Sequence, residues 1–122
     1  MTELPKPKLS PRNVNGVLKF YEGDTFSYCL YIELSDQDGV PVILDPNLAE
    51  IKVRFYDRRK QLIKEFAFGG TDGGEINENK ITLDFDTETS ALFKKGRYTY
   101  DCVLESGETR VTLLDGALLT VE

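Results

Sequence analysis

Length, composition and charge exclude several classes of protein before any motif is considered. The chain has 122 residues, 40% of them hydrophobic, which suffices for one domain with its own core, and its net charge of −6 disfavours a nucleic-acid partner. No apolar run reaches the roughly 20 residues of a membrane-spanning helix, and the first residues lack the apolar stretch of a signal peptide, so we expect a cytosolic product with no membrane partner.

The first fifteen residues differ in character from the rest of the chain. They contain several prolines and few apolar side chains, and proline removes backbone donors and favours extended conformations. This predicts an extended arm over residues 1–15 and a folded domain over residues 16–122. The arm is positively charged through Lys6, Lys8 and Arg12. Two interpretations stay open: a disordered terminus, or a strap that orders against a neighbouring subunit.

Alternating apolar and polar residues predict strands in the first half of the domain. Residues 17–22 lead into a turn at Gly23-Asp24, and residues 25–34 show the cleanest period-two alternation in the chain. A polar turn over residues 35–39 follows, and then a short edge segment, since Pro41 cannot donate into a central ladder. The next strand begins near residue 51 and ends at the turn that contains Arg58-Arg59-Lys60.

The second half continues the same pattern around one short helix. Strands are predicted over residues 62–68 and 81–85, and a helix of one or two turns within residues 86–95, capped by Asp86 or Thr87 and closed by Gly96. Residues 97–105 and 109–121 form a final hairpin. Strands at this spacing predict an all-β antiparallel sandwich of about seven or eight strands with one short connecting helix. The expected core contains Phe26, Leu30, Ile32, Val53, Phe55, Leu83 and Tyr100.

The last strand departs from simple alternation. Val111, Ala117 and Leu119 share one phase, whereas Leu114 and Leu118 occupy the other. Either Asp115-Gly116 is a bulge that shifts the phase, or Leu114 and Leu118 form an outward apolar surface that another protein covers.

The two cysteines are not expected to form a disulfide. Side chains alternate between the two faces of a strand, which places Cys29 on the polar face of its strand and Cys102 on the apolar face of another. One thiol therefore points outward and the other inward. Two reduced thiols also suit a cytosolic protein.

No pattern in the chain indicates catalysis, a cofactor or a resident metal. The glycine-rich residues 69–74 lack the lysine and helix of a phosphate-binding loop, and neither cysteine has a histidine to activate it. Asp36 and Asp38 offer too few oxygens for a calcium loop, and we interpret them as turn residues. We predict no catalytic, cofactor-binding or metal-binding residue.

Two further surface features have ordinary explanations. The basic clusters at residues 58–60 and 94–97 are short and lie at predicted turns, where solvated charge is usual. Glycan binding by a β-sandwich relies on exposed aromatic side chains, which Tyr21, Tyr31 and Tyr56 could supply. A glycan-binding module is therefore the alternative to a structural role.

Five short segments in order resemble one family of proteins. They are residues 23–27 (Gly-Asp-Thr-Phe-Ser), residues 34–42 with their Asp-Gly-Val-Pro turn, residues 81–83, residues 96–101 (Gly-Arg-Tyr-Thr-Tyr-Asp) and residues 111–116. Together they are similar to the immunoglobulin-like domains of phage baseplate upper proteins and related virion proteins, and the similarity covers most of the chain.

The resemblance implies a structural role in a bacteriophage particle. It implies an immunoglobulin-like sandwich that holds subunits together in a baseplate, tail or neck or at the capsid, made in the host cytoplasm and located in the virion. The implied partners are other virion proteins and copies of the same chain. The expected assembly contacts are Lys6, Lys8, Arg12, Leu114 and Leu118.

Overall fold

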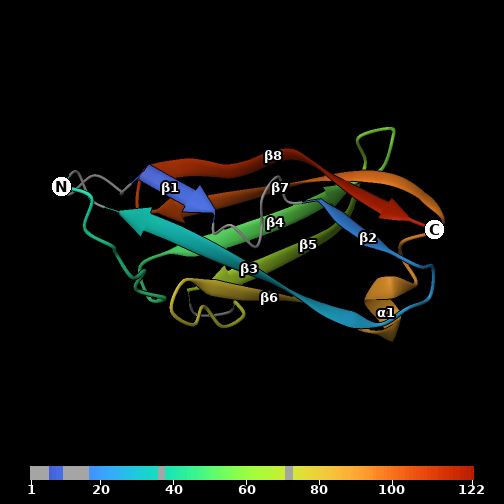
Figure 1. The fold of residues 1–122 in the computed structure, drawn as a ribbon, viewed down its shortest axis with the longest axis horizontal. Coiled ribbons are helices and arrows are strands. Elements are labelled where there is room, and N and C mark those ends of the chain that lie inside the picture. Colours follow the sequence, from blue (N-terminus) through green and yellow to red (C-terminus); the bar gives the residue numbers. More distant parts are fainter. Residues whose placement is uncertain (1–5, 10–16, 36–37, 71–72) are drawn as a thin grey trace.

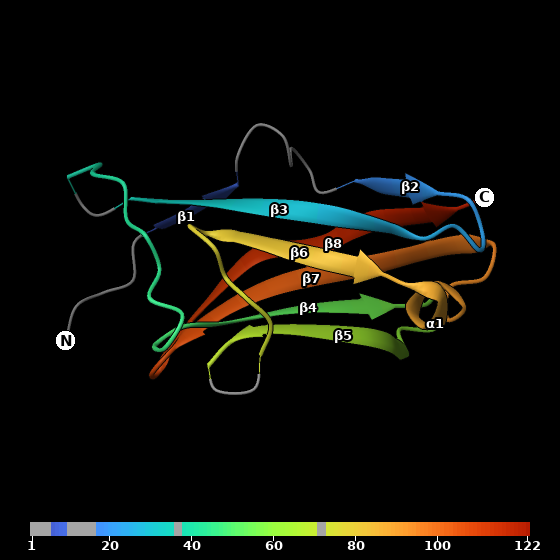
Figure 2. The same ribbon diagram turned by 90° about the horizontal axis from the view of Figure 1, so that it is seen from below.

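Two β-sheets face one another in the computed structural model, which describes residues 6–9, 17–35, 38–70 and 73–122 (Figures 1 and 2). The three-stranded sheet has the order β1 (Lys6–Leu9), β3 (Phe26–Ser35) and β6 (Lys80–Phe85). The five-stranded sheet has the order β2 (Leu18–Phe20), β8 (Thr109–Val121), β7 (Gly96–Ser106), β4 (Glu50–Tyr56) and β5 (Leu62–Gly69). The predicted β-sandwich is confirmed.

The strand order follows the immunoglobulin plan. The sheet β1-β3-β6 corresponds to strands A, B and E of that plan, and β8-β7-β4-β5 corresponds to G, F, C and C′. One pair departs from the predicted antiparallel arrangement, because β2 runs parallel to β8, with Leu18 opposite Leu119. After β2, the turn at Gly23-Asp24 carries the chain into the other sheet, so β2 does not form a hairpin with β3. It lies instead beside β8 and runs in the same direction.

Part of the predicted N-terminal arm belongs to the sandwich. β1 pairs antiparallel with β3, with Lys6 opposite Ser35 and Leu9 opposite Ile32. Pro7 is compatible with this position because β1 is an edge strand. Residues 1–5 and 10–16 lie outside the described residues, so the arm is placed only over residues 6–9.

Aromatic rings fill the core at the end where the helix lies. Phe55, Phe85 and Phe93 are fully buried, and their ring centroids lie 5.4–5.7 Å apart. The predicted core residues are buried except Phe26, which lies at the rim and stacks on Phe85 at 4.6 Å. Phe93 was not among them because it lies between the helix and β7, where no periodicity marks it.

The helix α1 (Thr87–Ser90) is shorter than the predicted segment. It begins after Asp86, whose carboxylate accepts a hydrogen bond from the Thr89 backbone at 2.8 Å and whose pKa this bond lowers. Ser90 Oγ donates to the Asp24 carbonyl oxygen at 2.6 Å, which fixes the helix against the turn between β2 and β3. The chain then leaves the helix, and Phe93 enters the core.

A bulge in β8 decides between the two interpretations of the last strand. Ala117 lies opposite Tyr100, whereas Leu114 lies opposite Cys102. Two residues of β8 therefore face one residue of β7, and Gly116 in this bulge has a φ of 67°. The bulge turns Leu114 toward the core, where it is half-buried against the core cluster.

A second shift in β8 restores the original phase. Leu104 lies opposite Val111, and Leu113 is the extra residue before the Cys102–Leu114 pair. Because two one-residue shifts cancel, the strand keeps the phase of residues 117–121 at both of its ends. The outward apolar surface formed by Leu114 together with Leu118 is therefore not present.

Candidate functional site

The predicted assembly residues do not gather on one surface. Lys6 and Lys8 lie on β1, but their side chains and all of Arg12 lie outside the described residues. Leu114 packs against the core, whereas Leu118 lies on the outer face opposite Thr99 and is 39% exposed. Leu118 alone remains as an outward apolar side chain of that pair.

The connections between strands gather at two opposite ends of the sandwich (Figures 1 and 2). We call the end that carries α1 the helix end; it contains residues 21–25, 57–61 and 86–95. We call the other end the loop end; it contains residues 38–49, 73–79 and 107–108. The strand pairing places these segments, because Tyr56 lies opposite Thr99 at the helix end and Glu50 lies opposite Glu105 at the loop end.

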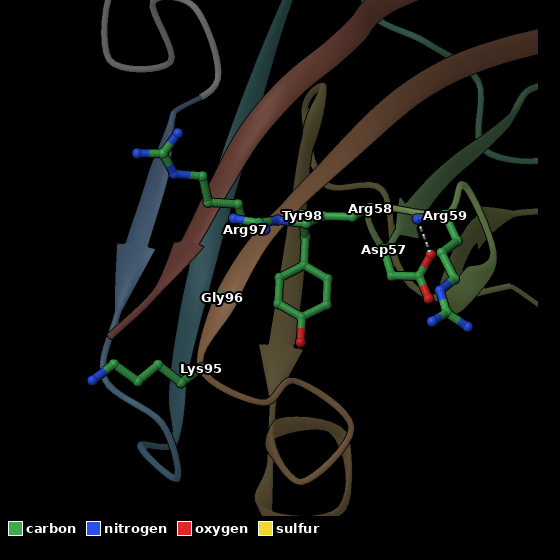
Figure 3. Close-up of a pocket in the computed structure, with 7 residues that line it drawn as sticks. All are labelled: Asp57, Arg58, Arg59, Lys95, Gly96, Arg97 and Tyr98. Atoms are coloured by element: carbon green, nitrogen blue, oxygen red, sulfur yellow. Dashed lines mark hydrogen bonds between the residues drawn. The ribbon is translucent and has the colours of Figure 1, made fainter.

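Two basic clusters that are distant in sequence meet at the helix end. Together they form what we call the basic patch: Arg58, Arg59, Lys60, Lys94, Lys95 and Arg97, all of them exposed. A shallow depression of about 380 Å³ lies between them, and Asp57 and Tyr98 also line it (Figure 3). Each cluster taken alone is an ordinary solvated turn, and the distance between the clusters in the sequence does not predict their proximity.

Hydrogen bonds fix both backbone segments of the basic patch. The Asp57 carboxylate accepts from the backbone of Arg59 at 2.8 Å and from that of Gln61 at 2.9 Å. On the other side, the Tyr98 hydroxyl donates to the Lys94 carbonyl oxygen at 2.7 Å. Burial raises the pKa of Tyr98, so this hydroxyl remains a donor at neutral pH. The cations are therefore presented on an ordered backbone.

Three cationic groups of the basic patch point apart rather than toward a common point. Figure 3 shows the side chains of Arg59, Lys95 and Arg97 extending in different directions from the rim of the depression. A small-anion site needs several donors aimed at one centre. The arrangement instead suits a broad, negatively charged surface.

The loop end has the opposite charge. Its described connections contain Asp38, Asp45, Glu75, Glu78 and Glu108, all exposed, and no lysine or arginine. The nearest basic side chains are those of the flanking strands, such as Arg110, whose Nε lies 3.9 Å from Glu105. The loop end is thus acidic, whereas the helix end combines the basic patch with the exposed acidic side chains of Glu22, Asp24, Asp86 and Glu88.

A buried asparagine organises the loop end. Asn79 is 5% exposed; its Oδ1 accepts from the Leu44 backbone at 2.7 Å, and its Nδ2 donates to the Val42 carbonyl oxygen at 2.7 Å. It adopts a φ of 63°, a conformation that asparagine tolerates better than most residues. The backbone of Gly70 also donates to Pro46 at 2.8 Å. Sequence reasoning missed Asn79 because nothing in its neighbours marks it.

Apolar side chains accompany the charges at both ends. At the loop end Val40, Ile43 and Leu48 are 55%, 64% and 69% exposed. At the helix end Leu62 and Leu92, which adjoin the two basic connections, are 53% and 47% exposed. Exposed apolar groups bordered by charge are the usual composition of a protein–protein contact.

The cysteines occupy the environments predicted for them. Cys29 is half-buried on β3, with its Sγ 3.6 Å from Thr82 Oγ1, and Cys102 is buried on β7. No disulfide joins this pair. Burial raises the pKa of Cys102 to about 12, so its reactive thiolate is scarce at neutral pH.

The outer face of the five-stranded sheet carries one poorly solvated carboxylate. Burial raises the pKa of Asp101, and Asp115 adds to this effect, whereas Arg54 on the adjacent strand opposes it. One oxygen of Asp101 is buried and has no hydrogen-bond partner among the described residues. In the described part of the chain, no three acidic or cysteine side chains lie close enough together to hold a metal ion.

The tyrosines considered for glycan binding lie on separate surfaces. Tyr21 is 64% exposed in the turn between β2 and β3 at the helix end. Tyr31 lies on the outer face of the three-stranded sheet, and Tyr56 lies on the outer face of the five-stranded sheet. These three side chains therefore form no common platform for a sugar.

Comparison with protein families and with curated proteins finds no relative. No protein-family model matches the chain, and no curated protein is significantly similar to it. Within the described residues, no helix has both the length and the apolar character needed to cross a bilayer. The candidate functional site therefore rests on the geometry of the two charged ends.

Proposed function

We propose that this chain is a non-enzymatic structural subunit of a bacteriophage particle and acts through protein–protein contacts. The observation that carries the proposal is the pair of opposite ends, each with exposed apolar side chains bordered by charge on a hydrogen-bonded framework. Such surfaces suit subunit contacts, because association buries the apolar groups and the charges select the partner.

The resemblance to phage virion domains supplies the biological setting of the proposal. Glycines from its segments, Gly23, Gly39, Gly96 and Gly116, all adopt positive φ, at 87°, 80°, 150° and 67°. These glycines therefore meet backbone requirements of the sandwich. The assignment to a baseplate, tail, neck or capsid surface follows from the resemblance and belongs to the proposal. We do not advance glycan binding, because no observation favours it.

Quantitative mass spectrometry of purified particles tests the proposal. In particles of a phage that encodes this chain, we expect the chain to sediment with the particles at a fixed copy number relative to the major capsid protein. A non-structural protein of the same phage serves as the control and should remain in the soluble fraction. Recovery of this chain only in the soluble fraction would contradict the proposal.

A further inference from the structure

We infer that copies of this chain stack head to tail, with the basic patch of one copy docked on the acidic loop end of the next. The inference rests on the proposed function, in which the chain acts through protein contacts. It names the partner as a second copy and assigns a different surface to each side of the contact.

Charge complementarity between the two ends is the first argument. The basic patch presents six exposed cations, and four of them, Arg58, Arg59, Lys95 and Arg97, line the shallow depression. The described connections of the loop end present acidic side chains and no basic ones. Two copies in the same orientation, end to end, bring these surfaces together, whereas contact between two basic patches or between two loop ends places like charges against each other.

Apolar complementarity is the second argument. Ile43 and Leu48 are the most exposed large aliphatic side chains of the loop end, at 64% and 69%. Leu62 and Leu92 adjoin the basic patch at 53% and 47% exposure. Head-to-tail docking removes apolar groups of both ends from water, and burial of such groups is the main favourable term in association. Charges and apolar groups thus favour the same orientation.

The form of the basic patch favours a protein partner over a small anion or a nucleic acid. The heads of Arg59, Lys95 and Arg97 diverge, so they do not converge on one phosphate group (Figure 3). The net charge of −6 repels the continuous phosphate backbone of a nucleic acid. A second copy offers a limited acidic surface flanked by apolar side chains.

The position of the two surfaces has a consequence for assembly. They lie at opposite ends of the strands, so one copy can engage a neighbour at each end at the same time (Figures 1 and 2). A contact between two different surfaces is heterologous, and its repetition produces a ring if the rotation closes or an open filament if it does not. A ring and an open filament both require that the basic patch of one copy fits the loop end of the next.

Sedimentation velocity over a range of concentrations tests the inference. For the unmodified chain in roughly 0.1 M salt, we expect the weight-average sedimentation coefficient to rise with concentration. In roughly 1 M salt this rise should move to higher concentration, because the attraction between the charged ends is screened as the Debye length falls from about 10 Å to about 3 Å. A monomer at all concentrations in low salt would overturn the inference.

Charge-reversal variants identify the surfaces. A basic-end variant, Arg58→Glu with Arg59→Glu, and an acidic-end variant, Glu75→Lys with Glu78→Lys, should each need at least about tenfold higher concentration to associate. An equimolar mixture of the two variants should form a dimer, because the acidic-end variant keeps an unaltered basic patch and the basic-end variant keeps an unaltered loop end. A control pair on the outer sheet faces, Thr82→Glu with Thr112→Glu, should associate like the unmodified chain.

Several outcomes would overturn the inference and leave the proposed function intact. Failure of the mixture to associate would show that the two ends do not meet. Retention of a short DNA duplex by the basic patch, with no self-association, would identify a nucleic acid as the occupant. Circular dichroism of each variant shows whether it is folded. A chain that is monomeric in solution but present in purified particles would contradict head-to-tail stacking only.

Discussion

Tyr28 on β3 and Tyr100 on β7 link the two sheets through a hydrogen bond between their hydroxyl groups. In immunoglobulin domains a disulfide joins the corresponding strands B and F. Here Cys29 faces outward, so a bridge to the inward Cys102 is impossible, and the polar link is a tyrosine pair. Burial is the main cause that raises the pKa of both tyrosines. The hydrogen bond that the Tyr100 hydroxyl donates to Tyr28 raises the pKa of Tyr100 further.

The raised pKa of Tyr100 predicts loss of stability at high pH. The unfolded tyrosine titrates near 10.0, and the folded one titrates higher. Above pH 10 the native state therefore binds more protons than the unfolded state, so the free energy of unfolding falls as pH rises. The contribution is fully present at neutral pH.

A pair of variants isolates this effect. Urea unfolding between pH 7 and pH 11 should show a shallower alkaline decline for Tyr100→Phe than for the unmodified chain, together with a loss of about 1 kcal/mol at pH 7 from the missing hydrogen bond. Tyr21→Phe, at an exposed tyrosine, should keep the original slope. An unchanged slope in Tyr100→Phe would show that this group does not govern the decline.

At the scale of elements, the strands β2 to β8 and the helix α1 follow from the sequence, whereas the pairing of β1 and the irregularities of the strands follow from tertiary contacts. The alternation in β3, β4 and β6 identifies their inward faces correctly. The faces of β5 are harder to predict. A register shift lies opposite Phe55 and Tyr56, and Leu62 is exposed. Lys64 lies with its Nζ 5.4 Å from the centre of the Phe66 ring. A one-residue shift reverses the faces and cannot be deduced from alternation alone.

The glycines of β8 and β5 give a matched test of two kinds of backbone constraint. A Cβ on Gly116 meets nothing within 4 Å, so Gly116→Ala should cost about 1–2 kcal/mol from its positive φ alone. Gly116→Asn should lose less, because asparagine tolerates this conformation. Gly69→Ala should lose more than either, because its Cβ would lie 2.1 Å from the Ala49 carbonyl oxygen.

Urea unfolding of the three glycine variants at one pH provides the comparison. The expected order of stability loss is Gly116→Asn, then Gly116→Ala, then Gly69→Ala. Equal stability of Gly116→Ala and the unmodified chain would contradict the bulge. A loss in Gly69→Ala no greater than in Gly116→Ala would contradict the close backbone approach.

At the scale of the whole molecule, the candidate site depends on topology more than on any motif. The sequence shows residues 58–60 and 94–97 as separate turns, and only the pairing of β4 with β7 brings them to one end. The acidic side chains of the loop end are likewise dispersed along the chain. The assembly contacts predicted from sequence, in the arm and at Leu114 and Leu118, depend on local residue patterns. Such patterns do not show which turns lie together in the folded chain.

Zero-length cross-linking of mixed isotopes tests the use of the two ends most directly. Equal amounts of unlabelled and nitrogen-15-labelled chain are treated with a carbodiimide, which joins an amine to a carboxylate only when the two are in contact. Peptides that combine both isotopes should link Lys60, Lys94 or Lys95 to Asp45, Glu75 or Glu78. Cross-links confined to one isotope, or mixed cross-links that avoid these two ends, would contradict the account.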